Sequence, residues 1–92
     1  MPLLDHARRA IEVIEHNGFV EYTARDNGTV LRLRGPYNVP AVDFWPTTGT
    51  CRQVGLEGAP VHRGAGVTFA VGLAFFGSAR AARTRTNLWR GY

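Results

Sequence analysis

One short segment in the N-terminal half limits the possible folds more than any other part of the chain. Asp26-Asn27-Gly28 lies between two runs in which apolar and polar residues alternate, residues 19–25 and residues 29–34. Asn-Gly is a preferred pair for a two-residue turn between antiparallel strands, because both residues tolerate positive φ angles. The sequence therefore predicts a β-hairpin, and any fold for this chain has to contain it.

A two-residue turn also determines which side chains share a face of the hairpin. It places Tyr22 opposite Leu33 and Ala24 opposite Leu31 on the same side. We expect this apolar side to face the core.

The opposite side of the predicted hairpin is basic. It carries Arg25, Arg32 and Arg34, and one acidic neighbour, Glu21, lies across the strands. Two interpretations stay open for this side. It is either a solvated outer face, as is usual for antiparallel sheets, or a patch that contacts phosphate groups.

Helical patterns flank these strands. Apolar residues recur at steps of three and four over residues 3–16, and Asn17-Gly18 supplies a helix stop. Residues 67–76 fit a helical stripe and also a strand alternation. Because the alanines within residues 79–82 can continue a helix, we expect a helix here and keep a strand as the alternative.

A third strand is predicted over residues 41–45, and residues 50–54 form a short fourth extended piece. If Val42 and Phe44 point inward, Trp45 lies on the side that carries the arginines. There its indole could stack on a nucleic-acid base. The alternative is an aromatic residue that covers the edge of the core.

Ninety-two residues support one small core, so we expect a single α+β domain. The expected order is α-β-β-β-α, with a small antiparallel sheet packed against two helices over residues 1–77. Residues 78–92 are expected to form a basic C-terminal arm or a helix extension. A single cysteine excludes an internal disulfide, and no signal peptide or membrane-spanning stretch is apparent, so we expect a cytoplasmic protein.

The charge distribution points to an anionic partner. The net charge of +4 comes from eleven arginines, no lysine and seven acids. The last fifteen residues hold no acid, and they combine arginines that can contact phosphates with aromatic residues that can stack on bases. The candidates in this stretch are Arg80, Arg83, Arg85, Arg90, Trp89 and Tyr92. For these last fifteen residues the alternative is a solvated tail or arginines that cap a helix. Arg63, which opens the segment Arg-Gly-Ala-Gly, completes the set of candidate binding residues.

Catalytic and metal-binding patterns are missing from the sequence. His6, His16 and His62 are far apart in the chain, with no cysteine or carboxylate at the spacing of metal ligands. Ser78 has no adjacent base and Cys51 has no nucleophile context. We therefore expect no enzyme, no metal site and no cofactor.

The order of these elements resembles the double-stranded RNA-binding domain and, more closely, the HicA-type toxins. The matching pieces are residues 11–19, the hairpin around Gly28 and residues 63–67. The resemblance implies RNA binding, and for HicA-type proteins a ribonuclease with a histidine in a Gly-Ser-His motif. This chain has Gly-Thr-Val at residues 28–30, so no catalytic residue is carried over, and a divergent ribonuclease stays the second alternative.

A second resemblance concerns residues 42–49 followed by residues 63–67, which look like small proteins of bacteriophages and prophages. It implies action in the cytoplasm of a bacterial host. We therefore expect a non-catalytic protein that binds RNA, DNA or a nucleoprotein complex through its arginines. The first alternative is an inhibitor of a host defence complex such as a CRISPR effector.

Overall fold

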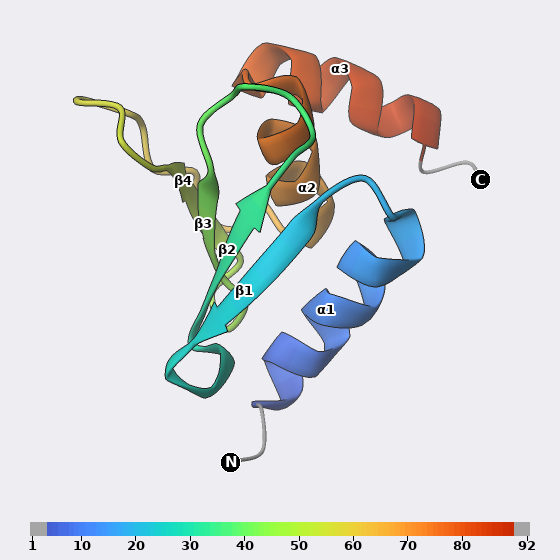
Figure 1. Ribbon diagram of the computed structural model, residues 1–92, viewed down its shortest axis with the longest axis vertical. Helices are drawn as coiled ribbons and strands as arrows, with labels where there is room; N and C mark the ends of the chain where they lie inside the picture. Colours follow the sequence, from blue (N-terminus) through green and yellow to red (C-terminus); the bar gives the residue numbers. More distant parts are fainter. Residues whose placement is uncertain (1–3, 90–92) are drawn as a thin grey trace.

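A four-stranded antiparallel sheet and three helices make up the described part of the chain in the computed structural model (Figure 1). The structure describes residues 4–89, with side chains for residues 4–84. The predicted α+β class and the order of helix, strands and helix are confirmed. The elements are α1 (Asp5–Asn17), β1 (Glu21–Arg25), β2 (Val30–Arg34), β3 (Val42–Trp45), β4 (Thr50–Gln53), α2 (Val67–Phe76) and α3 (Ala79–Trp89).

The predicted hairpin is present in β1 and β2. Its connection contains the short 3-10 turn η1 (Asp26–Gly28), and the last strand pair before it is Arg25 with Val30. The φ angle is positive at Asp26 (52°), Asn27 (59°) and Gly28 (91°), and the last two residues occupy the central positions of a type I′ turn. The backbone N–H of Thr29 donates a hydrogen bond to the carbonyl of Asp26 at 3.1 Å. Local turn chemistry therefore fixes the register of the first two strands.

That register is the predicted one, but the apolar side of β1 is more exposed than expected. Tyr22 pairs with Leu33 and Ala24 pairs with Leu31. Leu31 and Leu33 are fully buried, whereas Tyr22 is half-buried and Ala24 is exposed. The reason is the position of β1 at the edge of the sheet, where the covering helices bury only part of its inner side.

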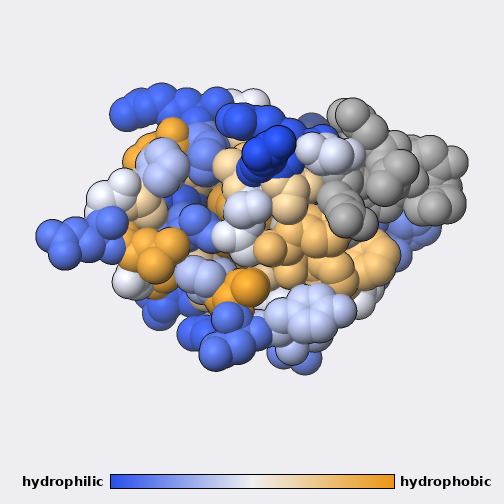
Figure 2. All heavy atoms as spheres, turned by 90° about the horizontal axis from the view of Figure 1, so that it is seen from above, coloured by the Kyte–Doolittle hydropathy of each residue, from blue (hydrophilic) through white to orange (hydrophobic). Residues whose placement is uncertain are grey.

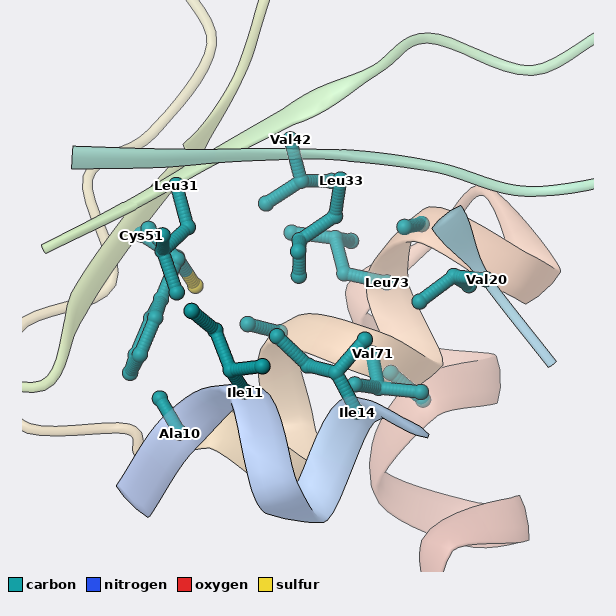
Figure 3. Close-up of a cluster of buried hydrophobic side chains, with 14 residues drawn as sticks. Ala10, Ile11, Ile14, Val20, Leu31, Leu33, Val42, Cys51, Val71 and Leu73 are labelled. Carbon is teal, nitrogen blue, oxygen red and sulfur yellow. The ribbon is translucent and has the colours of Figure 1, made fainter. Parts of the chain in front are cut away.

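The helices cover one face of the sheet. The strand order is β1-β2-β3-β4, α1 and α2 pack against this sheet, and α3 packs on α2. Figure 3 shows side chains of α1 and α2 meeting those of the strands in a single core. The largest fully buried side chains are Ile14, Leu31, Leu33, Val42, Cys51, Val71 and Leu73. The side chains on the other face of the sheet point away from this core.

Residues 67–76 form a helix, as predicted, but α2 does not continue through the alanines. The chain turns at Gly77 (φ 84°), whose N–H donates to the carbonyl of Leu73 at 2.9 Å. Ser78 Oγ then accepts the N–H of Ala81 and caps the start of α3. The expected extension of α2 is therefore wrong, because a left-handed glycine followed by a capping serine separates two helices.

Residues 67–76 belong to the core, since Ala70, Val71, Leu73 and Ala74 are fully buried. No helix within residues 4–89 has the length and apolar content needed to cross a membrane.

Residues 61–66 run antiparallel along the outer edge of β4. His62 and Cys51 exchange two backbone hydrogen bonds, of 2.9 and 3.0 Å, and Gly66 N–H donates to Gly49 O at 3.0 Å. Strand-like alternation is confined to Val61, His62 and Arg63 around this bridge, because Arg63 and Gly64 lie in a turn. His62 turns toward α2, and its neighbours Val61 and Arg63 reach the uncovered face of the sheet.

Candidate functional site

The uncovered face of the sheet, called the open face below, gathers five of the predicted binding residues: Arg25, Arg32, Arg34, Trp45 and Arg63. Arg25 and Arg34 are exposed there, and Arg32 lies between them on the same side. Val42 and Phe44 are buried on the other side, so Trp45 shares the open face, as the sequence predicts. The open face consists of Glu21, Thr23, Arg25, Val30, Arg32, Arg34, Asp43, Trp45, Thr50 and Arg52 on the strands, together with Val61 and Arg63.

One arginine of this face already has a partner. Arg32 Nε donates to Asp43 Oδ1 at 2.9 Å, and Arg32 Nη2 donates to Asp43 Oδ2 at 3.1 Å. This hydrogen-bonded carboxylate raises the pKa of Arg32 above its ordinary value. Asp43 also lies opposite Arg52 on β4. The hairpin alone predicts Glu21 as the acidic neighbour of these arginines, and the pairing of β2 with β3 adds Asp43 as a second acid.

Trp45 lies in a shallow hollow of the open face. This hollow, called the Trp45 hollow below, has a volume of about 260 Å³ and is lined by Trp45, Thr48, Thr50, Arg52, Val61 and Arg63. Trp45 is half-buried, while Arg52 and Arg63 are exposed on the same rim. An aromatic ring and two guanidinium groups that line one hollow match the combination that holds a base and its flanking phosphates.

A second hollow lies on the other side of residues 61–65. This hollow, called the Arg83 hollow below, has a volume of about 480 Å³ and is lined by Val61, His62, Arg63, Ala65, Phe69 and Arg83. The guanidinium carbon of Arg83 is 5.7 Å from the centre of the Phe69 ring, and the His62 ring lies 5.0 Å from the same ring. Arg63 lines both hollows, so it connects the arginines of the open face with Arg83 of α3.

Arg52, Arg63 and Arg83 thus lie along the edge of β4, and Arg83 is the one residue of the C-terminal basic cluster that the described side chains place there. Arg52 was missed, although alternation along the fourth strand would have placed it on the open face. His62 was missed as well. Only its backbone pairing with Cys51, eleven residues earlier, brings it to α2.

The remaining predicted residues lie on α3 or beyond it. Arg80 is exposed but does not line either hollow. Arg85 and Trp89 belong to α3, and their side chains lie outside the described residues, as do Arg90 and Tyr92 entirely.

The outer side of α1 differs from the open face in charge. Its exposed side chains include Arg8 and Arg9 together with three acids, Asp5, Glu12 and Glu15. His6 and His16 are exposed on the same helix, as expected. Among the side chains that the structure describes, no three His, Cys, Asp or Glu residues lie close enough together to hold a metal ion.

The end of the molecule near the β2–β3 loop carries aromatic side chains. Phe75 is at the centre, with Phe19 and Tyr37 each 5.3 Å away and Phe76 at 4.8 Å between ring centres. Figure 2 shows this end, where apolar side chains gather beside polar ones. No arginine of the two hollows belongs to this aromatic cluster.

Comparison with known proteins gives no relative, since no family model, curated protein or solved structure matches this chain. The likeness to RNA-binding domains, HicA-type toxins and phage proteins stays at the level of a resemblance.

Proposed function

We propose that this protein binds single-stranded nucleic acid without catalysis, through the open face and the adjoining edge of β4. The observation that carries this proposal is Trp45, half-buried in its hollow with Arg52 and Arg63 on the rim. Guanidinium groups offer planar donor pairs to phosphate oxygens, and an indole offers an apolar face to a base.

An unpaired strand fits this arrangement better than a duplex does. Bases within a duplex already stack on both sides, so a ring recessed among arginines reaches only a base that has left the stack. The phosphate contacts fall to arginines without an acidic partner. Arg25, Arg34, Arg52 and Arg63 have no ion pair within the described part of the chain, whereas Arg32 is held by Asp43.

The chemistry of the Trp45 hollow supports binding without cleavage. Its lining consists of tryptophan, threonine, arginine and valine, so it offers neither a histidine nor a carboxylate for proton transfer. A labelled single-stranded RNA incubated with the protein should stay intact over hours. RNA cleavage that His62→Ala abolishes would instead support the divergent ribonuclease.

A paired substitution tests the proposed surface. Affinity for a fluorescent oligonucleotide of about twelve nucleotides is measured by anisotropy at low salt. Arg52→Ala combined with Arg63→Ala removes two phosphate contacts, and we expect affinity to fall by roughly tenfold or more. Arg8→Ala combined with Arg9→Ala removes the same charge from α1 and should change affinity by less than about threefold. Equal losses in the two double variants would reject the open face as the binding surface.

Trp45 is tested separately. Stacking on a base is worth about 1–3 kcal/mol, so Trp45→Ala should weaken oligonucleotide binding by roughly five- to 150-fold. Trp45→Phe keeps an aromatic ring and should recover much of this loss. If Trp45→Ala keeps its circular dichroism spectrum and binds as the unmodified protein does, no base stacks there.

A host protein or nucleoprotein complex is the competing partner. A pull-down from bacterial lysate, repeated after nuclease digestion, separates the two cases. We expect nucleic acid in the untreated sample and no retained protein after digestion. A single protein that is retained after digestion, and that Arg52→Ala with Arg63→Ala releases, would favour an inhibitor of a host complex.

A further inference from the structure

We infer that the Arg83 hollow is a phosphate-binding subsite. The inference deepens the proposed function, on which it rests for the source of the phosphate, namely the backbone of the bound strand. Its basis is the convergence of Arg63, His62 and Arg83 on one hollow from two separate segments of the chain.

The charge of this hollow is positive and uncompensated. Arg63 and Arg83 contribute two guanidinium groups to its lining. The lining holds no carboxylate, and neither arginine forms an ion pair with any acid that the structure describes. Both guanidinium groups therefore keep their donors available for an anion.

Packing restricts the position of these donors before a ligand arrives. The guanidinium carbon of Arg83 lies 5.7 Å from the centre of the Phe69 ring, and this cation–π contact restricts the positions that the guanidinium can take. His62 is held by its two backbone bonds to Cys51, and its ring packs beside Phe69. A site with restricted donors loses less side-chain entropy on binding.

The fold also fixes α3 relative to this edge of the sheet. Gln53 Nε2 donates to the carbonyl of Gly77 at 2.9 Å, which ties the corner between α2 and α3 to β4. Arg83 follows this corner by six residues. The hollow is large enough for a phosphate with its sugar, since small-ligand sites range from about 300 to 1,000 Å³.

The shared rim suggests a path for the bound strand. Arg63 lines both hollows. A strand whose base lies over Trp45 therefore crosses residues 61–65 beside Arg63 and delivers a neighbouring phosphate to Arg83.

Amide resonances in two-dimensional NMR spectra test the subsite on the full chain. The probes are inorganic phosphate, a nucleoside monophosphate and the same nucleoside without phosphate, each at low salt. We expect both phosphate probes to shift residues 62–65 and the amides of Phe69 and Arg83, and the nucleoside to leave them unchanged. Arg83→Ala should weaken nucleoside monophosphate binding by about tenfold or more, and Arg80→Ala, on the same helix outside the hollow, by less than about twofold.

Several results would overturn the inference. Equal effects of Arg83→Ala and Arg80→Ala would do so, as would phosphate-induced shifts confined to other parts of the chain. If Arg83→Ala perturbs the fold, Arg63→Ala and Arg83→Gln are tested in its place. Unchanged phosphate binding in both of these variants would also overturn the inference.

The oligonucleotide titration separates this inference from the proposed function. Oligonucleotide binding that Arg83→Ala does not weaken would reject the subsite and leave the proposed function standing. Phosphate binding in the hollow by a protein that binds no oligonucleotide would support the subsite, reject the proposed function and identify a free phosphate compound as the ligand.

Discussion

At the scale of single residues, Asp43 controls how much positive charge the open face presents. Its carboxylate takes both hydrogen bonds that Arg32 directs across the sheet, and it faces Arg52 on the other side. Arg32 was predicted from the hairpin alone to contact phosphate. The structure gives it Asp43 as its partner, so the face has one fewer donor for a ligand than the count of arginines suggests.

Removing this acid should strengthen nucleic-acid binding. Asp43→Asn eliminates one negative charge from the open face and releases Arg32, so we expect tighter oligonucleotide binding at low salt. The slope of log affinity against log salt should steepen by up to about 0.7 for a single strand. Glu12→Gln makes the same charge change on α1 and serves as the control. Weaker binding by a folded Asp43→Asn protein would contradict this role for Asp43.

The single thiol is expected to be unreactive in the folded protein. Cys51 is fully buried, and burial raises its pKa from 9.0 to about 11. The stability gained from keeping the thiol protonated is fully present below about pH 9 and is lost as the pH rises through about 11. At pH 8 the thiolate fraction is about a hundredfold lower than in the unfolded chain, so a thiol reagent should react at least that much more slowly. Equal reaction rates with and without urea would contradict the buried position.

At the scale of elements, the corner between α2 and α3 positions Arg83. Gly77 has a φ of 84°, and a Cβ added there would lie 2.8 Å from Val39 Cγ1. A side chain at this position therefore meets both backbone strain and a contact with the β2–β3 loop.

Gly77→Ala should lower the free energy of unfolding by about 1–3 kcal/mol, as measured by urea denaturation. Gly58 is the matched control, because its φ of 74° is similar and its Cβ would meet no atom within 4 Å. Gly58→Ala carries the cost of the backbone conformation alone, so we expect a smaller loss. A larger loss for Gly58→Ala would show that the corner is not held as described.

The sequence predicts those elements whose turn residues or periodic pattern lie within a short stretch of the chain. The Asn27-Gly28 turn and the alternation along each strand are sufficient to assign the register of the hairpin and the side on which Trp45 lies. By contrast, the two hollows form because residues 61–66 lie beside β4, where backbone hydrogen bonds hold them. Such bonds leave no periodic pattern of side chains in a stretch rich in glycine. For this reason, the sequence could not predict that Arg83 and His62 both lie beside Phe69.

At the scale of the whole molecule, charge is distributed unevenly between the two sides. The open face carries five arginines and two acids, whereas the outer side of α1 carries two arginines and three acids. The arginines of the open face are Arg25, Arg32, Arg34, Arg52 and Arg63, and those of α1 are Arg8 and Arg9. An anionic polymer is therefore attracted to the side that holds Trp45, and this attraction has to depend on salt.

The salt dependence of oligonucleotide binding tests the central claim most directly. Affinity of the full chain for a labelled single strand is measured by anisotropy over a series of sodium chloride concentrations. Contacts from Arg25, Arg34, Arg52, Arg63 and Arg83 would release about three to five counterions, so we expect a slope of log affinity against log salt between about −2 and −3.5. An affinity that is absent at low salt, or that does not change across the series, would contradict nucleic-acid binding by this protein.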